Sequence, residues 1–120
     1  MKPAQKTDLP TLLPMPAQRA RLRLNRTFTK EQAALLKLGF VPLEMEDKWF
    51  IYFENATLHF HRSWTGACIY QVACDEEAGG TLRITRALVN RDPEQYIETR
   101  NERDVETISQ LINTFLLQRD

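Results

Sequence analysis

The stretch KWFIYFENATLHFHRSWTG, from Lys48 to Gly66, decides the fold of this 120-residue chain. It holds both tryptophans and both histidines, and its apolar and polar residues alternate with the period of two that is typical of β-strands. Turn-forming residues interrupt the alternation at Asn55-Ala56 and at Thr65-Gly66, which predicts two tight hairpins. The strands expected around these turns are 49–54, 57–64 and 67–74.

The length of each turn sets which side chains share a face of the sheet. A two-residue loop at Asn55-Ala56 places one set of pairs on a core face: Phe53 with Leu58, Ile51 with Phe60, and Trp49 with Arg62. The other face then pairs Tyr52 with His59 and Phe50 with His61, and a two-residue loop at Thr65-Gly66 adds Tyr70 beside His61 and Cys68 beside Ser63. A shift of one residue would exchange the two faces.

The segments before this stretch predict a leader, a strand and a short helix. Residues 1–17 hold four of the six prolines and no periodicity, so we expect a flexible or extended leader outside the core. The run RARLRLNRTF, from Arg19, alternates as a half-buried edge strand does. Thr29 and Gln32 have the spacing of a capping box, and Gly39 supplies a stop, which predicts a helix over 30–38 with inward residues Ala34, Leu35 and Leu38.

The segments after the hairpins predict one more strand and a C-terminal helix. A strand over 81–89 follows the turn at Ala78-Gly79-Gly80, and Asp92-Pro93-Glu94 has the residues that open a helix. The last apolar residues recur at helical spacing, as Val105, Ile108, Leu111, Ile112, Phe115 and Leu116. We therefore predict an α+β fold for a single domain over 18–120: an antiparallel meander of three to four strands, a short N-terminal helix, and a longer C-terminal amphipathic helix packed on one face.

The composition is that of one folded domain with an uneven distribution of charge. Hydrophobic residues make up 42% and charged residues 27% of the chain, and the net charge is zero. Residues 1–40 nevertheless carry eight Lys/Arg against two Asp/Glu, whereas 41–120 carry eight against fourteen. The two parts should attract each other, so docking within the chain is at least as good an explanation of the basic segment as an external polyanion.

Several classes of protein and site are not indicated. No cleavable signal peptide or apolar stretch of membrane-spanning length is apparent, so we expect a cytoplasmic, bacterial-type protein without a membrane partner. Cys68 and Cys74 lie too far apart along one strand for a disulfide. His59 and His61 point the same way, but two ligands are too few for a metal site, and we expect neither a metal nor a cofactor. A pair of Cys68 and His61 as nucleophile and base is less expected than inert packing.

The second hairpin face is the candidate ligand-binding surface, because it combines rings, imidazoles and hydroxyls. Arg62 at its rim could stack on Trp49 and still bind a phosphate or carboxylate, with donors nearby. Structural stacking alone and a simple tight turn anchored by Trp64 are the alternatives. The predicted ligand-binding residues are Phe50, Tyr52, His59, His61, Arg62, Ser63, Thr65, Gly66 and Tyr70, and no catalytic residue is assigned.

A row of arginines at positions 19, 21, 23 and 26 is the only feature typical of nucleic-acid binding. It lacks the context of a known motif, and the acidic remainder of the chain should repel a phosphate backbone. Charges that keep an edge strand from aggregating explain the row more simply. From the sequence we therefore do not expect nucleic acid as a partner.

The strings DKWFIYFE, HRSWTGACIY and VNRDPEQY resemble a small bacterial family of about one hundred residues that carries names of the ADP-ribosyl-glycohydrolase type. The resemblance covers Phe40 to the C-terminus and implies ADP-ribose or a related nucleotide as ligand. The acidic metal-binding motifs of a true ADP-ribosyl-glycohydrolase are absent, and the chain is short for that all-helical enzyme. We therefore expect a non-catalytic binding or accessory module for a nucleotide-like ligand. The alternatives are a small hydrolase of nucleotide-like substrates with His61 as general base, and a protein-interaction module such as a toxin-neutralising partner.

Overall fold

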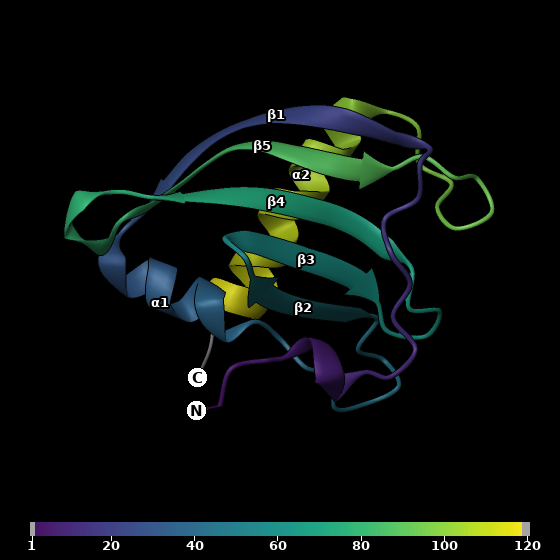
Figure 1. Ribbon diagram of the computed structural model, residues 1–120, viewed down its shortest axis with the longest axis horizontal. Coiled ribbons are helices and arrows are strands. Elements are labelled where there is room, and N and C mark those ends of the chain that lie inside the picture. Colours follow the sequence, from purple (N-terminus) through teal and green to yellow (C-terminus); the bar gives the residue numbers. More distant parts are fainter. Residues whose placement is uncertain (1, 119–120) are drawn as a thin grey trace.

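The computed structural model describes residues 2–118 and contains a five-stranded antiparallel sheet with helices packed on one face (Figure 1). The first residue of the predicted leader and the last two of the predicted domain lie outside this range. The strands are β1 (Arg19–Phe28), β2 (Trp49–Glu54), β3 (Thr57–Arg62), β4 (Cys68–Glu76) and β5 (Leu82–Asn90). Their order in the sheet is β1-β5-β4-β3-β2.

The α+β class is confirmed, but the number of strands is five rather than three to four. The four strands β2 to β5 form the expected meander, and β1 adds a fifth because it pairs with β5 along most of its length. The helices are α1 (Lys30–Leu38) and α2 (Asn101–Leu111), which continues as the π-helical segment η3 (Ile112–Leu117). Two single 3₁₀ turns complete the described chain, η1 (Lys6–Asp8) and η2 (Ala78–Gly80), and none of its helices has the length and hydropathy of a membrane span.

The first hairpin has the predicted register. Asn55 and Ala56 both have φ of 54°, as a two-residue turn of this handedness requires. The turn sets Ile51 opposite Phe60 and Tyr52 opposite His59. The pair Ile51 and Phe60 faces the helices, and the pair Tyr52 and His59 faces away from them.

The pairing register of β3 and β4 next to Phe60 differs from the predicted register by one residue. The chain leaves β3 at Arg62 and enters β4 at Cys68, so the loop is longer than the predicted Thr65-Gly66 turn. Tyr70 therefore lies opposite Phe60 instead of beside His61, and a register shift next to this pair brings Cys68 opposite His61. Because side chains alternate between faces, the shift moves Tyr70 to the helix-covered face. The predicted positions of Tyr70 and Cys68 are wrong for this reason.

The short helix α1 begins and ends as predicted. The hydroxyl of Thr29 accepts a hydrogen bond from the backbone N–H of Gln32, the Gln32 side chain accepts one from the N–H of Thr29, and Gly39 ends the helix with φ of 65°. Its buried residues are Ala33 and Leu36, however, and Ala34 is exposed. The inward face is rotated from the predicted one because the helix packs between β2 and η3, which its own periodicity does not encode.

The segment after β5 is a loop tied to α2, and the helix predicted to open at Asp92 forms only one turn. Arg91 donates to the carbonyl of Glu98 (2.9 Å), to Asn101 Oδ1 (2.6 Å) and to Asp104 Oδ2 (2.5 Å). These hydrogen bonds fix residues 91–100 as a loop before α2 begins at Asn101. The fully buried Asp104 also accepts hydrogen bonds from the hydroxyls of Tyr70 (2.8 Å) and Tyr96 (2.6 Å), so the buried carboxylate is satisfied.

The main core lies between the sheet and the helices, and a smaller cluster lies on the opposite face. Ile108, Leu111, Ile112 and Leu116 are buried against the sheet, which confirms the amphipathic C-terminal helix. The smaller cluster consists of Ala4, Phe50 and Tyr52, with Leu9, Leu12 and Val41 packed around it.

The N-terminal segment is part of this second cluster, which differs from the expectation of a leader outside the core. Figure 1 shows it running past the ends of β2, β3 and β4 to the start of β1. The N–H of Ala4 donates to the carbonyl of Leu38 (2.7 Å), and the N–H of Leu13 donates to the carbonyl of Gly66 (2.9 Å). Its prolines suit an extended segment that packs against the sheet without pairing as a strand, because proline has no backbone N–H to donate.

Candidate functional site

Four of the predicted ligand-binding residues do share one face of the sheet. The ring of Tyr52 is stacked on His59 at 4.6 Å between centroids and lies 5.7 Å from His61, and Phe50 is 5.5 Å from Tyr52. The N-terminal segment covers most of this cluster, since Phe50 and His61 have exposed fractions of 0% and 3%. Only His59 keeps appreciable access to the open part of the face.

The two histidines have fixed hydrogen bonds. Gln71 Nε2 donates to His59 Nδ1 (3.3 Å) and His59 Nε2 donates to the carbonyl of Glu54 (3.3 Å), while His61 Nδ1 donates to the carbonyl of Gly66 (2.9 Å). Burial lowers the pKa of both imidazoles from the ordinary value of 6.5, against an opposing contribution from these carbonyl groups. Both rings are therefore neutral at pH 7 and donate or accept in set directions.

Cys68 lies opposite His61 but is not activated. Burial raises the pKa of its thiol to about 12, so the thiolate needed for nucleophilic attack is scarce at neutral pH. Cys68 and His61 both line a groove of about 360 Å³ between the sheet and residues 12–15 of the N-terminal segment, which we call the second groove.

The predicted rim at Arg62 to Gly66 is separated from the aromatic face. Arg62 lies over the ring of Trp49 at 5.0 Å, as predicted. This pair is on the helix side of the sheet, whereas Tyr52 is on the other face. The Ser63 hydroxyl donates to the carbonyl of Asp47 (2.7 Å), and the Thr65 hydroxyl accepts from the N–H of Ala67 (3.2 Å). Arg62 and Thr65 instead line a small pocket of about 150 Å³ with Lys48 and Trp64.

Two further predictions about the rim have clear outcomes. Gly66 does need a positive φ (78°), and a Cβ there would meet the carbonyl oxygen of Thr11 at 2.0 Å. Trp64 is no core anchor, since 65% of its surface is exposed and its ring N–H donates to the carbonyl of Met45 (3.1 Å). Arg62, Tyr52 and Tyr70 thus do not converge on one ligand: Tyr52 is on the other face and Tyr70 is fully buried.

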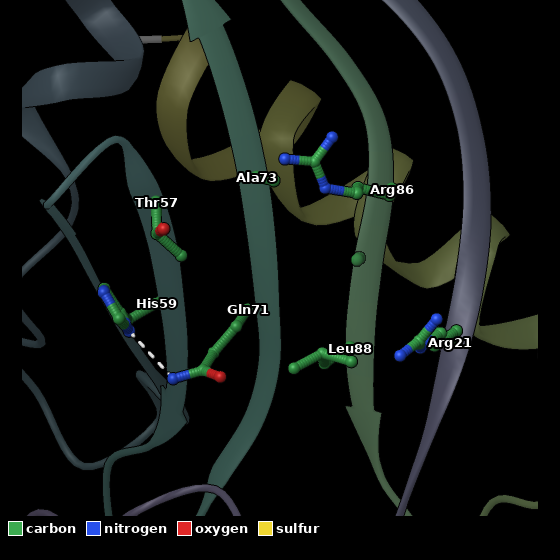
Figure 2. A pocket seen from close by; sticks show the side chains of 8 residues that line it. Arg21, Thr57, His59, Gln71, Ala73, Arg86 and Leu88 are labelled. Atoms are coloured by element: carbon green, nitrogen blue, oxygen red, sulfur yellow. Dashed lines mark hydrogen bonds between the residues drawn. The ribbon is translucent and has the colours of Figure 1, made fainter.

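The face of the sheet away from the helices, which we call the open face, has a larger groove of about 480 Å³. This groove lies over β3, β4, β5 and β1. Figure 2 shows Arg21 of β1 and Arg86 of β5 projecting on the side of the sheet away from α2, with the bonded His59 and Gln71 across the groove. The remaining lining side chains are small or aliphatic: Thr57, Ala73, Ala87 and Leu88. The groove thus has a basic side, a polar side and an apolar floor, and only His59 was predicted as a ligand-binding residue.

The arginines of this groove have no acidic partner among residues 2–118. Arg23 lies directly opposite Arg86 in the β1–β5 pair, and Arg21 lies one position along the same face. All three side chains are exposed, and no ion pair or hydrogen bond engages them within the described chain. Like charges directly opposite each other destabilise a sheet, so this arrangement favours an external anion.

The basic N-terminal part packs against the remainder of the chain, as expected, but it does so through backbone pairing and apolar contacts rather than through ion pairs. In residues 2–40 only Lys37 forms an ion pair with the acidic part, to Glu76. Arg26 is bound inside the protein by the neutral side chains of Ser109 and Asn113. The sequence carries a signal for Arg86 of the groove, because the apolar residues of its strand mark the buried face and leave Arg86 on the exposed one.

Within residues 2–118, no group of three His, Cys, Asp or Glu side chains is arranged to hold a metal ion. In comparisons with known proteins, no family model, curated protein or solved structure matches this chain. The resemblance to the family with ADP-ribosyl-glycohydrolase names therefore stays a prediction.

Proposed function

We propose that this protein is a non-catalytic binding module for an anionic, nucleotide-like ligand, and that the ligand lies in the open-face groove. The observation that carries the proposal is the pair Arg21 and Arg86, two exposed guanidinium groups without internal partners at one groove. The nucleotide class follows the resemblance to the family named after enzymes of ADP-ribose, and the arginine pair replaces Arg62 as the anion-binding element.

The chemistry of the groove suits a phosphate joined to a ring. A guanidinium group binds phosphate oxygens through two parallel N–H donors and keeps its charge at any ordinary pH. Leu88 and Ala73 form an apolar floor for a ring, and the Gln71 amide can exchange hydrogen bonds with polar ring atoms. The volume of about 480 Å³ falls in the range of small-molecule sites.

Binding is favoured over hydrolysis by the groups nearest the groove. Both ring nitrogens of His59 are engaged, with Gln71 and with the carbonyl of Glu54, so neither is free to take a proton from a water. His61, the base of the hydrolase alternative, lies under the N-terminal segment, and the Cys68 thiol beside it stays protonated.

Calorimetric titration of the protein with ADP-ribose, AMP and NAD tests the proposal. We expect binding by the wild type and a loss of about 1.5–3 kcal/mol for Arg21→Ala or Arg86→Ala, because each removes a charge-assisted hydrogen bond. That loss corresponds to roughly 10-fold to 150-fold weaker binding.

Two variants complete the design. Arg100→Ala removes an exposed arginine at the start of α2 that lines neither candidate pocket, and this variant should bind as the wild type does. Arg62→Ala tests the rim site predicted from the sequence. Loss of binding in Arg62→Ala with none in Arg21→Ala would move the site to the rim, and no heat from any of the three ligands in the wild type would refute the nucleotide proposal.

A further inference from the structure

We propose that the natural ligand of the open face is a polymer, a single strand of nucleic acid whose phosphates lie along β1 and β5. This inference rests on the proposed function and names the ligand class more closely. It is carried by a row of arginines that extends beyond the groove needed for one nucleotide: Arg19, Arg21, Arg23 and Arg86.

The row follows from the alternation of β1. Arg19, Arg21 and Arg23 occupy successive outward positions, which are roughly 6.6 Å apart at about 3.3 Å per residue. Leu22 between them is buried on the helix side. Arg86 lies beside Arg23 on the next strand. Four charges at this spacing match a flexible chain of repeated phosphates better than a single compact anion.

Protection of the sheet edge explains only part of the row. β1 is an edge strand of the sheet, and outward charges on such a strand discourage pairing with other chains. β5 is paired on both sides, with β1 and with β4, so Arg86 protects no edge. Its position opposite Arg23 is unfavourable in the isolated protein, and an anion between the two side chains would remove the repulsion.

Within residues 2–118, no acidic side chain forms an ion pair with the row. Asp75 lies opposite Arg83, further along β5, and we leave Arg83 out of the row for that reason. Glu54 lines the second groove, at the far side of His59 from the arginines. Asp104 is buried on the helix side, where Arg91 pairs with it. The sequence-based argument that acidic residues repel a phosphate backbone therefore does not apply to this face.

A single strand fits the face better than a duplex. The groove beside the arginines is floored by Leu88 and Ala73 and bordered by the ring of His59 and the amide of Gln71. An unpaired strand can turn its bases into such a groove while its phosphates stay on the arginines. A duplex keeps its bases stacked inside and would leave the groove empty.

Fluorescence anisotropy with a labelled oligothymidylate of about twelve nucleotides tests the inference, since this length covers the usual site of one domain. The measurement is the slope of log Kobs against log salt concentration. Four phosphate contacts on a single strand give a slope of about −2.8, and Arg23→Gln should reduce its magnitude by about 0.7. Arg23→Lys should keep the slope, and Arg100→Gln is the matched control with an unchanged slope. A thermal melt confirms that each variant is folded.

The outcomes separate this inference from the proposed function. Single strands that bind more tightly than AMP, with the steep slope, support both. If AMP or ADP-ribose binds through Arg21 and the oligonucleotide binds no more tightly, the polymer inference fails and the proposed function stands. A duplex of the same length that binds equally well would overturn the assignment to single strands, and an oligonucleotide slope unaffected by both Arg23→Gln and Arg86→Gln would place the contact elsewhere.

Discussion

At the scale of the residue, arginines that look equivalent in the sequence have different roles. Arg21 and Arg26 belong to the same run, but the register of β1 shifts between Arg23 and Arg26. Arg26 faces the helices, where it donates to Asn113 Oδ1 (2.8 Å) and lies over the ring of Phe28 (4.7 Å). Arg21 is exposed on the open face and is bound to nothing within the described chain.

This difference predicts opposite consequences for two matched substitutions. We expect Arg26→Ala to lower the free energy of unfolding by about 1–3 kcal/mol, because it leaves Asn113 without its partner and removes packing against Phe28. Arg21→Ala should change it by less than about 0.5 kcal/mol, as is usual at the surface. Urea unfolding monitored by tryptophan fluorescence measures both values. Equal losses in the two variants would show that Arg21 has a structural role too.

At the scale of the element, one glycine holds the N-terminal segment on the sheet. Gly66 lies against the backbone of Thr11, and its carbonyl accepts hydrogen bonds from the N–H of Leu13 and from His61. The segment in turn covers the cluster around Phe50 and lines the groove that contains Cys68. A side chain at position 66 should lift the segment.

We therefore expect Gly66→Ala to expose the Cys68 thiol, because a Cβ at position 66 cannot coexist with the Thr11 carbonyl. Exposure should return the raised thiol pKa toward its ordinary range, so labelling by a disulfide reagent at pH 8 should become faster. Gly79→Ala is the control, since Gly79 also has a positive φ (83°) but open space around its Cβ position. Cys74, on the helix side, should remain slow in both. Unchanged labelling in Gly66→Ala would mean that the segment yields without leaving the sheet.

At the scale of the whole molecule, the two faces of the sheet hold different buried polar groups. The helix side contains Asp104 with its hydrogen-bond partners Tyr70 and Tyr96, and the opposite side contains the two neutral histidines. Burial lowers the pKa of His61 below 6.5, so the unfolded chain takes up a proton at a higher pH than the folded chain does. Well above pH 6.5 both states are neutral, and this group contributes no pH dependence.

Below pH 6.5 the free energy of unfolding should therefore fall, with a slope of at most about 1.4 kcal/mol per pH unit from His61. Melting temperatures measured from pH 7.5 to 5.0 check this. His61→Asn, which keeps an N–H near the Gly66 carbonyl but does not titrate, should give a flatter profile. A profile as steep as that of the wild type would assign the acid sensitivity to other groups.

The sequence alone determined what depends on neighbours along the chain. The Asn55-Ala56 turn fixed the register of β2 and β3, the Thr29 capping box and Gly39 bounded α1, and helical spacing identified the C-terminal helix. The alternation in the sequence also placed His59, His61, Tyr52 and Phe50 on one face of the sheet. Each of these features follows from local geometry, because a turn or a cap is specified within a few residues.

Only the tertiary structure decided which part of that face is open. The loop from Ser63 to Ala67 changed the register of β4 by one residue and buried Tyr70, and the N-terminal segment covered Phe50 and His61. The pairing of β1 with β5 brought Arg23 opposite Arg86, from positions far apart in the sequence. Such contacts depend on loop length and on packing between distant segments, which no local pattern encodes.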